Sequence, residues 1–350
     1  MSFKIQVEPS GHEFSAEEDE KILDAAIRQG INLPYGCRNG FCGDCQASLT
    51  EGSVDYPDGI PPVMADNSDG ICYTCQAVPK SDLLLGVVEI AQSKDIPIRT
   101  MPCKIDRIER LNDDVIRLYL KLPEGERLQF LAGQYLNFIL QDGSKRAFSI
   151  ANAPHDDDFI ELHIRHVSGG LFTDTLFNGM EEKTIMRIEA PLGSYYLRED
   201  STKPIILMGG GTGFAPLKGI IEHAFQIGVE REMHLYWGVR SRSDLYLPEL
   251  PQRWAAEHNI FTYTPVLSEP DDDWDGRRGW VHDAVITDYP DLSGHEVYMS
   301  GPPPMIKAGK QAFLAAGLAG EELYSDSFEY GAAAARQKTG TVPLRALIPD

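Results

Sequence analysis

The amino-acid sequence predicts a multidomain chain: a small α+β domain, then an antiparallel β domain, then an α/β domain built on a parallel sheet. Three observations lead to this prediction. Five of the six cysteines lie between Cys37 and Cys75. Short apolar runs separated by turn residues follow from about residue 102, and strand-then-helix units follow from Pro204. At 350 residues the chain is long enough for two or three separate cores.

Composition and charge limit the kind of protein this can be. Hydrophobic residues make up 42% and charged residues 24%, as in ordinary globular proteins. The formal net charge is −21, so we expect no nucleic-acid partner and favour a protein partner with a basic surface. No apolar run reaches 18 residues, so we expect no membrane insertion. The beginning, "MSFKIQVEPSGHEF", has no signal pattern, so we expect the cytoplasm as the location. We also expect a monomer.

The stretch "YGCRNGFCGDC" indicates an iron–sulfur cluster. Its spacing is Cys37-x4-Cys42-x2-Cys45, and Cys75 follows after 29 further residues, which is the plant-type [2Fe-2S] pattern. Disulfides are rare in the cytoplasm, and thiolates are suitable ligands for iron. Glycine lets the backbone pass close to the cluster and take positive φ. The glycines of this stretch are Gly36, Gly40 and Gly43.

Zinc is the alternative for these cysteines. Cys72 and Cys75 form a C-x2-C pair in "CYTC", as many structural zinc sites do. A zinc site would leave Cys37 without a role and the glycines without a reason, so the pattern favours [2Fe-2S]. The remaining cysteine, Cys103 in "MPCKI", is expected to be a strand residue.

Residues 1–92 resemble a plant-type ferredoxin. Their sequence predicts two short strands, a helix over about 21–29 and then the cysteine loop. The resemblance implies a ferredoxin-like β-grasp domain of the α+β class. "TCQA" matches the ferredoxin pattern and favours Cys75 as the fourth ligand, with Cys72 as a buried small hydrophobe. Residues 93–101 are the predicted linker.

The rest of the chain changes pattern twice. "DVIRLYLKLP", "QYLNFILQDG", "RAFSIANAP" and "DFIELHIRHV" read as short strands of an antiparallel barrel or sandwich. "PIILMGGGTGFAPLKGIIEHAF" then reads as an apolar strand, a glycine-rich turn and a helix. "REMHLYWGVR" and "HEVYMSGPPPMIKAGKQAFLAAG" repeat that theme. The alternation predicts a parallel sheet with ligands at the carboxyl ends of its strands.

The tetrapeptide Arg146-Ala147-Phe148-Ser149 resembles the R-x-[YF]-S motif of the ferredoxin–NADP reductase superfamily. An outward arginine on a strand is the ordinary alternative for such a short motif. The resemblance implies an antiparallel β-barrel in which Arg146 binds a flavin phosphate. It also implies that Phe148 packs on the isoalloxazine and that Ser149 hydrogen-bonds near flavin N5. Arginine suits a phosphate because its guanidinium is always charged and bidentate.

"HVSGGLFTDTLF" leads through glycines into a helix, whose free first-turn amides make an anion site. Alone, this stretch could be any helix start. At this distance after the first motif, the superfamily uses the element for the flavin pyrophosphate, and its form resembles that of FAD rather than FMN proteins. The residues predicted to contact the flavin here are His163, Ile164, Arg165, Gly170, Phe172 and Thr173.

"GGGTGFAP", over 209–216, is not the G-x-G-x-x-G of a dinucleotide Rossmann unit. It resembles the turn that holds the NAD(P) pyrophosphate in ferredoxin–NADP reductase relatives. "GVRSRSDLY" and "SGPPPMI" fall where that family places its ribose and nicotinamide contacts. The predicted nucleotide-binding residues are Gly211, Thr212, Gly213, Gly238, Arg240, Gly301 and Pro302. Trp237 and Trp280 are expected to be buried packing residues.

The resemblance also implies domain bounds and catalytic residues. The FAD-binding barrel covers 102–200, the NAD(P)H-binding domain 204–328 and a C-terminal extension 329–350. Most of the family has Cys-Gly-Pro near the nicotinamide, where this sequence has Ser300-Gly301-Pro302. An aromatic covers the flavin in relatives, and Phe328 in "SDSFEY" fits that role. The predicted catalytic residues are Ser149, Ser300 and Phe328.

The order ferredoxin, flavin domain, nicotinamide domain resembles the reductase components of bacterial oxygenases. Benzoate and terephthalate dioxygenase reductases have it, as do phenol and methane monooxygenase reductases and CDP-6-deoxy-glucoseen reductase. The resemblance implies electron transfer from NADH to FAD, to the cluster and to a partner protein, most simply a terminal oxygenase. A deoxysugar dehydratase or a small-molecule acceptor is the alternative. A non-catalytic redox module is the rival class, and the intact motifs argue against it.

The nucleotide preference is predicted from "VLSEPDDDWDG". Ser268 is followed by Glu269, where NADP-specific relatives carry an arginine for the 2′-phosphate. A carboxylate there repels a phosphate and can accept a hydrogen bond from ribose. Arg240 and Arg242, in contrast, are positively charged and would favour the 2′-phosphate of NADPH. Weighing both observations, we expect NADH in preference to NADPH.

Overall fold

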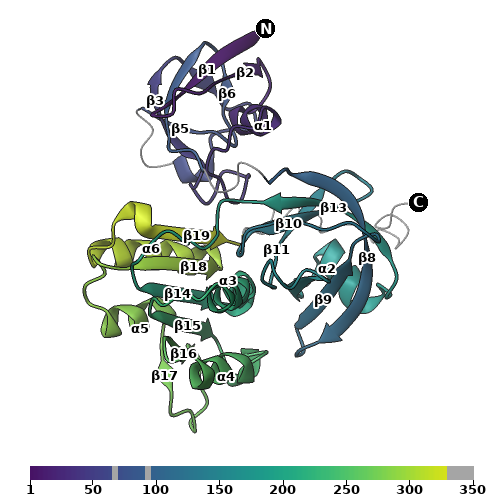
Figure 1. Cartoon of the computed structure of the whole chain (residues 1–350), viewed down its shortest axis with the longest axis vertical. Helices are drawn as coiled ribbons and strands as arrows, with labels where there is room; N and C mark the ends of the chain where they lie inside the picture. Colours follow the sequence, from purple (N-terminus) through teal and green to yellow (C-terminus); the bar gives the residue numbers. More distant parts are fainter. Residues whose placement is uncertain (65–69, 91–95, 329–350) are drawn as a thin grey trace. The chain divides into compact units, whose positions relative to one another are not determined.

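The computed structural model describes residues 1–64, 70–90 and 96–328. It divides into two compact units, Met1–Pro97 and Ile98–Asp350 (Figure 1). The predicted C-terminal extension and residues 91–95, which include the first residues of the predicted linker, lie outside the described residues. No helix in the described residues is long and apolar enough to cross a membrane.

The first unit is a mixed five-stranded sheet in the order β2-β1-β7-β3-β5, with one helix. β1 pairs antiparallel with β2 and parallel with β7, and β3 pairs antiparallel with β7 and β5. This arrangement confirms the predicted α+β class. The elements are β1 (Ser2–Glu8), β2 (Glu13–Glu17), α1 (Ile22–Arg28), β3 (Gln46–Glu51), β4 (Val54–Asp55), β5 (Ile71–Tyr73), β6 (Val78–Pro79) and β7 (Leu83–Gly86).

Helix α1 forms because its apolar residues recur on one side. Ile22, Leu23, Ala25 and Ala26 are fully buried and pack into the core of this unit. Gly30, with φ +75, follows the helix and turns the chain toward the cysteine loop. The helix therefore lies where the sequence predicted it, over about 21–29.

The second unit begins with an antiparallel sheet in the order β11-β10-β13-β8-β9-β12. An isolated bridge between Ile150 and Leu162 joins the ends of its two outer strands, so the sheet closes into a barrel rather than a sandwich. Phe172 and Leu176 of α2 pack into the barrel core. The elements are β8 (Arg99–Arg110), β9 (Val115–Lys121), β10 (Tyr135–Ile139), β11 (Lys145–Ser149), β12 (Ile160–Arg165), α2 (Leu171–Asn178) and β13 (Ile185–Leu192).

Two details of the barrel bear on the sequence predictions. Cys103 is a buried strand residue, as expected. β8 already begins at Arg99, so the last residues of the predicted linker belong to the barrel.

The remainder of the second unit is a fully parallel sheet in the order β17-β16-β15-β14-β18-β19. From β14 the chain adds strands first on one side, from β15 to β17, and then on the other, with β18 and β19. The order of strands therefore reverses beside β14, and the crevice at the carboxyl end of β14 is the expected ligand site. The strands are β14 (Ile205–Gly210), β15 (Met233–Val239), β16 (Phe261–Leu267), β17 (Arg277–Arg278), β18 (Glu296–Gly301) and β19 (Leu323–Ser327). The helices are α3 (Phe214–Gln226), α4 (Glu249–Glu257), α5 (Val281–Asp288) and α6 (Pro303–Ala315).

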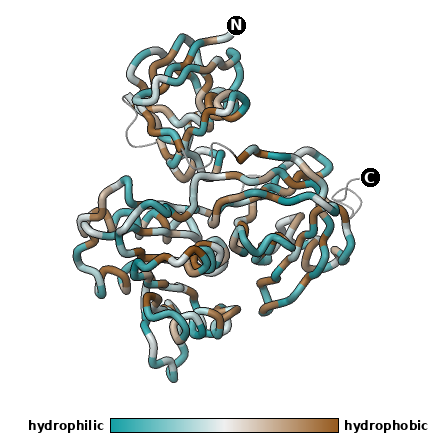
Figure 2. Tube along the Cα trace, viewed as in Figure 1, coloured by the Kyte–Doolittle hydropathy of each residue, from teal (hydrophilic) through white to brown (hydrophobic). Residues whose placement is uncertain are grey.

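Helices cover both faces of this parallel sheet. Leu207 on β14 packs with α3 and α4 residues, whereas its neighbour Met208 packs with residues of α5 and α6. Alternate residues of a strand point to opposite faces, so β14 is apolar throughout. Figure 2 shows hydrophobic segments within the body of each unit and hydrophilic stretches in the loops.

Candidate functional site

The four predicted cluster ligands form two pairs at the surface of the first unit's core. The Sγ atoms of Cys45 and Cys75 are 3.2 Å apart. The backbone N–H groups of Cys37 and Cys42 each donate to the other's Sγ at 3.4 Å. No group of three or more His, Cys, Asp or Glu side chains in the described ranges is placed to hold a single metal ion. Two pairs of thiolates suit a cluster of two irons, in which each iron takes two cysteine ligands.

The loop around these pairs leaves no room for side chains at its glycines. A Cβ on Gly36 would lie 2.4 Å from Asp44 Oδ2 and 3.2 Å from the Sγ of Cys42. Gly40 and Gly43 have φ of +83 and +87, which residues other than glycine rarely adopt. Glycine at these positions therefore lets the backbone pass close to the cysteine side chains.

Cys72 is separate from this group. It is fully buried on β5 opposite Ala47, within the apolar core. Burial raises the pKa of its thiol to about 12, so it stays protonated. The adjacent Gln76, which sequence reasoning missed, donates to the carbonyl of Arg38 at 2.8 Å and approaches the Sγ of Cys75 at 3.7 Å. This placement supports Cys75 as the fourth ligand.

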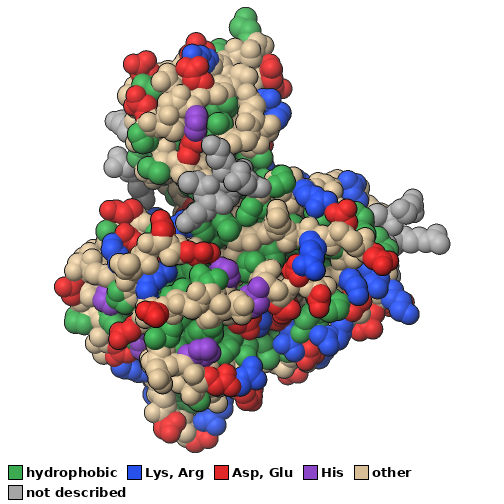
Figure 3. Space-filling model, in the orientation of Figure 1, with side chains coloured by type: hydrophobic (Ala, Val, Ile, Leu, Met, Phe, Trp, Pro, Cys, Tyr) green, Lys and Arg blue, Asp and Glu red, His purple; other side chains and the backbone are tan. Residues whose placement is uncertain are grey.

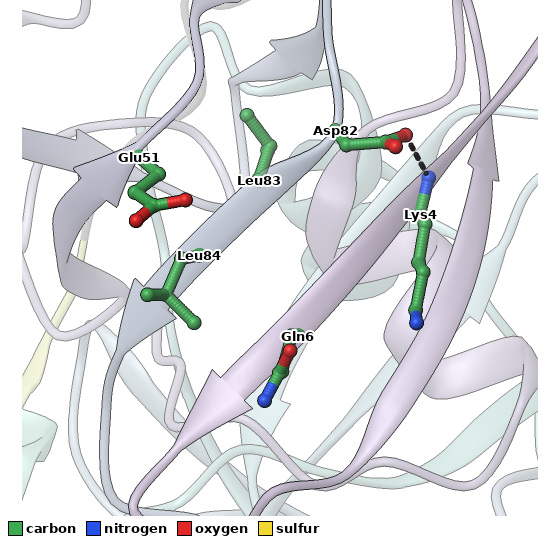
Figure 4. A pocket seen from close by; sticks show the side chains of 6 residues that line it. All are labelled: Lys4, Gln6, Glu51, Asp82, Leu83 and Leu84. Carbon is green, nitrogen blue, oxygen red and sulfur yellow. Dashed lines mark hydrogen bonds between the residues drawn. The ribbon is translucent and has the colours of Figure 1, made fainter.

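The first unit also has a small cavity of about 190 Å³ on its sheet, which contains none of the cysteines (Figure 4). One edge is closed by the backbone N–H of Lys4, which donates to Asp82 Oδ1 at 2.8 Å. The lining residues are Lys4, Gln6, Glu51, Asp82, Leu83 and Leu84. The cavity plays no part in the cluster site.

Strand β11 carries the first flavin motif. Phe148 is half-buried, with its ring centroid 5.8 Å from that of Phe138 and 5.5 Å from that of Phe172, so part of the ring stays open. Arg146 donates to the carbonyl of Lys145 at 2.9 Å and has no carboxylate within salt-bridge distance among the described residues. An open aromatic face and an unpaired guanidinium fit a flavin with its phosphate. Ala147 is exposed between them.

The turn before α2 is held by Thr173. Its hydroxyl donates to the carbonyl of Val167 at 3.0 Å and accepts from the N–H of Val167 at 3.2 Å. A Cβ on Gly170 would lie 2.9 Å from that carbonyl. Phe172 is only 2% exposed and belongs to the barrel core. The turn thus has one defined shape at the amino end of a helix, which suits a pyrophosphate.

The side chains of the "HIR" segment already have protein partners. Arg165 pairs with Asp114 at 2.9 Å, and Ile164 is fully buried in the barrel core. His163 is buried between Glu161 and Tyr246. Flavin contacts from these three residues stay predictions, and they would come from the backbone.

The nucleotide turn lies at the carboxyl end of β14. A Cβ on Gly213 would lie 2.0 Å from the carbonyl oxygen of Ser300 on β18. The indole Nε1 of Trp237 on β15 donates to the carbonyl of Gly211 at 2.9 Å, and this hydrogen bond stabilises the turn. Position 238 also lacks room for a side chain, since a Cβ added to Gly238 would lie 2.7 Å from Val281. The glycines at 211 and 213 leave backbone exposed at the crevice, which fits a pyrophosphate. Thr212, the one residue of this turn with a side chain, is half-buried.

The three predicted catalytic residues lie at the ends of β11, β18 and β19, and one of them, Ser149, is hydrogen-bonded to a carboxylate on β19. Ser149 Oγ donates to Asp326 Oδ2 at 2.8 Å, although 177 positions separate the two residues in the sequence. Asp326 on β19 lies opposite Ser300 on β18, and the N–H of Phe328 donates to the carbonyl of Gly301 at 3.0 Å. Ser300 Oγ is buried and has no hydrogen-bond partner in the described residues. Sequence reasoning missed Asp326; its signal is the position two before Phe328 on the same strand face.

The loops after β15 and β16 adjoin each other. The N–H of Glu269 donates to the carbonyl of Arg240 at 2.8 Å, so the two residues with opposite implications for the nucleotide are neighbours. Arg242 lies over the ring of Trp274 at 5.3 Å and 3.6 Å from Asp273.

The tryptophan predictions had mixed outcomes. Trp237 is fully buried, which confirms the expectation. Trp280 is 65% exposed, so the expectation that it would be buried is wrong. The reason is its position just before α5 and after β17, the last strand at that edge of the sheet.

Family models match three stretches of the chain. Residues 5–80 match the 2Fe-2S iron-sulfur cluster binding domain, 102–196 the oxidoreductase FAD-binding domain and 207–311 the oxidoreductase NAD-binding domain. These matches and the geometry agree on [2Fe-2S], FAD and a nicotinamide nucleotide as cofactors.

Full-length relatives have the same organisation. The chain is 39% identical over 328 residues to a CDP-6-deoxy-L-threo-D-glycero-4-hexulose-3-dehydrase reductase of Yersinia pestis, covering 94% of this chain and 99% of the relative. It is 33% identical to a terephthalate 1,2-dioxygenase reductase component of Comamonas sp., covering 95% and 98%. The crystal structure of the Amycolatopsis cytochrome P450 reductase GcoB superimposes with a TM-score of 0.78 at 33% identity, covering 93% and 98%.

We predict that Cys75→Ser removes or alters the EPR signal of the reduced cluster, because Cys75 is paired with Cys45. Cys72→Ser should leave that signal unchanged, since Cys72 lies in the core away from both pairs. Cys103→Ser is a control in the barrel. An altered signal in Cys72→Ser with a normal one in Cys75→Ser would reverse the ligand assignment.

We also predict that Gly213→Ala weakens NADH binding while FAD stays bound. The added Cβ collides with the carbonyl of Ser300, and overpacking of this kind costs about 1–3 kcal/mol. If about 1 kcal/mol of that cost separates the free from the NADH-bound state, the dissociation constant rises roughly fivefold, measured by NADH titration at equal flavin content. Gly294→Ala is the matched control, since nothing lies within 4 Å of its Cβ. Equal affinities for NADH in the two variants would contradict the placement of the turn.

Proposed function

The chain belongs to the family of reductases that join a [2Fe-2S] ferredoxin domain to FAD-binding and NAD-binding domains, and we propose that it carries electrons from NADH to a partner protein. One observation supports this most directly. Ser149 of the flavin motif is hydrogen-bonded to Asp326 of the nicotinamide module at 2.8 Å, so the two sites adjoin at one point. The paired cysteines of the first unit supply the third redox site.

When bound, FAD and the [2Fe-2S] cluster would supply the redox chemistry, which divides the electron pair of NADH into single electrons. The chain's residues bind and orient them. Arg146 would hold the flavin phosphate and Phe148 one face of the ring. Ser149, oriented by Asp326, would present its hydroxyl beside the flavin. The backbone at Gly211–Gly213 would hold the nucleotide pyrophosphate.

The residues at the ends of β18 and β19 would shape the place where the two rings meet. Ser300 Oγ is a buried donor without a partner in the described residues, and a bound nicotinamide could supply one. Phe328, tied by its backbone to Gly301, would cover the flavin. Serine in place of the family's cysteine makes this wall more polar.

The proposed acceptor is the terminal oxygenase of a multicomponent oxygenase. A sugar dehydrase is the second candidate. The 33% identity to the terephthalate reductase supports an oxygenase, and the 39% identity to the Yersinia reductase supports a dehydrase. Turnover of the holoprotein with NADH and ferricyanide tests the reductase itself. Reconstitution with a purified oxygenase and with a purified dehydrase decides between the acceptors. We further propose a cytoplasmic monomer whose partner has a basic docking surface.

We predict that the holoprotein releases FAD, not FMN, on heating, and that Phe148→Ala weakens FAD binding. Loss of an aromatic face costs about 1 kcal/mol or more beyond the buried area, which is roughly fivefold in affinity. FAD release is followed by its fluorescence during dilution. Phe159→Ala is the control, because that ring lies on another part of the barrel beside Tyr119. Equal FAD affinity in the two variants would contradict a stacking role for Phe148.

We predict a higher kcat/KM for NADH than for NADPH, because Glu269 at the end of β16 repels a 2′-phosphate. Glu269→Arg should reduce or reverse that preference by about tenfold or more, worth ~1.4 kcal/mol. Glu257→Arg makes the same change of charge on exposed α4 and should leave the preference unchanged. A wild-type preference for NADPH above about tenfold would exclude this assignment.

We predict that electron delivery to the partner slows as ionic strength rises. Residues 1–92 contain 15 Asp and Glu against 5 Lys and Arg, and Figure 3 shows acidic side chains across the visible face of this unit. Opposite charges speed encounter, and salt screens them over about 8 Å at physiological strength. Stopped-flow transfer to the purified partner across a salt series measures this, with ferricyanide turnover as the control that changes much less. A rate that is flat or rises with salt would mean that the acidic surface does not steer docking.

A further inference from the structure

Three charged or polar side chains are buried where the barrel meets the parallel sheet. Glu161 and His163 lie on β12 of the barrel, and Lys218 lies on α3 of the nicotinamide module. Their exposed fractions are 6%, 5% and 5%. All three belong to the second unit, Ile98–Asp350. None of the three side chains has a part in the flavin or nucleotide chemistry described above, where His163 is predicted to contact the flavin only through its backbone.

The three side chains form one continuous network. Lys218 Nζ lies 3.2 Å from Glu161 Oε2 and 2.8 Å from Glu222 Oε2. Glu161 Oε1 lies 2.8 Å from His163 Nε2. His163 Nδ1 lies 3.1 Å from the hydroxyl of Tyr246. The network therefore crosses between the two modules twice, once through the ion pair and once through the histidine.

The pKa shifts indicate which groups of this network carry a proton. Burial raises the pKa of Glu161, but the hydrogen bond from His163 and the charges of Lys218 and Arg117 outweigh burial and bring it to about 2. Burial lowers the pKa of His163, so the ring is neutral. An ionised carboxylate can only accept, so His163 donates from Nε2 and accepts at Nδ1 from the Tyr246 hydroxyl. Each of these hydrogen bonds thus has one defined donor and one defined acceptor.

The network is adjacent to both cofactor sites. Lys218 also donates to the carbonyl of Ala151 at 3.3 Å, two residues after Ser149. A Cβ on Gly219 would lie 2.9 Å from the carbonyl of Asn152, so α3 lies directly against the segment that follows the flavin motif. α3 itself starts one residue after the glycine turn.

Aromatic packing connects the network to the glycine turn. Phe214, the first residue of α3, stacks on Trp237 with a centroid distance of 4.2 Å, and Trp237 donates to Gly211. Phe214 also lies 6.1 Å from Tyr246, the partner of His163. A displacement of α3 against β12 would therefore displace the nucleotide turn.

Burying charges here has a cost that packing alone would avoid. Apolar residues of the same size often give equal or greater stability than a buried ion pair. Apolar contacts are non-directional, however, whereas hydrogen bonds to charged groups define both distance and angle. Hydride transfer depends on that geometry, since a misplacement of about 1 Å can cost 100-fold in rate.

We propose that Lys218, Glu161 and His163 are positioning residues, which hold α3 and its nucleotide turn in the register with the flavin strands that hydride transfer requires. The proposal rests on the proposed function, because it assumes that NADH reduces FAD. It assigns these residues no contact with either cofactor.

The experiment uses the holoprotein with FAD and cluster loaded. Lys218→Met and Glu161→Gln each break the bridge, and each leaves a buried group without its partner. The double variant Lys218→Met/Glu161→Gln removes both charges of the bridge. Glu222 loses Lys218 as a partner, but its side chain is 26% exposed and can be solvated, so the double variant should fold with a smaller penalty than either single variant. Lys218→Arg is the conservative variant. Lys203→Met is the control, since Lys203 pairs with Glu322 at 2.6 Å just before β14, at the opposite end of that strand from the glycine turn.

Four measurements separate positioning from stability: FAD content, the midpoint of thermal unfolding, flavin reduction at saturating NADH in stopped flow, and the long-wavelength charge-transfer absorbance of reduced protein with NAD⁺. We expect the double variant to keep FAD and a midpoint near that of the wild type, yet to reduce flavin about tenfold or more slower with weaker charge-transfer absorbance. Lys218→Arg should recover most of the rate, and Lys203→Met should match the wild type in rate.

Two results would overturn the proposal. One is a double variant that reduces flavin within twofold of the wild type. The other is a double variant that loses FAD or unfolds early, which would make the network a stabilising one only. Failure of the wild type itself to reduce FAD with NADH would instead reject the proposed function, so the two failures are distinguishable.

Discussion

Hydride transfer requires two bound rings in contact, and the proposed flavin and nucleotide sites adjoin where the barrel and the parallel sheet share a boundary. The hydrogen bond from Ser149 to Asp326 crosses this boundary at 2.8 Å. On one side β11 presents the flavin motif, and on the other β18 and β19 end in the crevice beside the glycine turn. The packing of α3 against the barrel matters for function because it defines the relation between these two surfaces.

Backbone approach is the second theme of the molecule. At Gly36 and at Gly213 an added Cβ would collide with another part of the chain, a carboxylate oxygen in one case and a carbonyl in the other. Glycine is required at both places for different ligands: an iron–sulfur cluster surrounded by backbone, and a pyrophosphate resting on a turn. The two units share this feature, because in both the proposed ligand is a charged group that backbone must approach closely.

Polar groups are buried in this chain where orientation matters. Lys218, Glu161 and His163 are satisfied by one another, which limits the cost of their burial. Ser300 differs, since its buried hydroxyl has no partner within the described part of the chain. A satisfied network defines a geometry, whereas an unsatisfied donor in a crevice leaves capacity for a ligand.

The sequence by itself determined what depends on neighbouring residues. Cysteine spacing indicated the cluster, alternation predicted β9 to β12, and the glycine-rich turn between a strand and a helix located the nucleotide site. The same local signals placed α1 and the parallel sheet. Each of these can be read within a window of one or two elements, because the physical cause lies in backbone freedom and strand or helix periodicity.

Only the tertiary structure decided what depends on residues far apart in the chain. Barrel closure comes from the bridge between Ile150 and Leu162. The meeting of Ser149 with Asp326 spans 177 positions, and that of Glu161 with Lys218 spans 57. The exposure of Trp280 follows from its place at a sheet edge, which no local pattern indicates. Such contacts depend on how whole elements pack. The sequence alone does not show whether a carboxylate faces water or a serine.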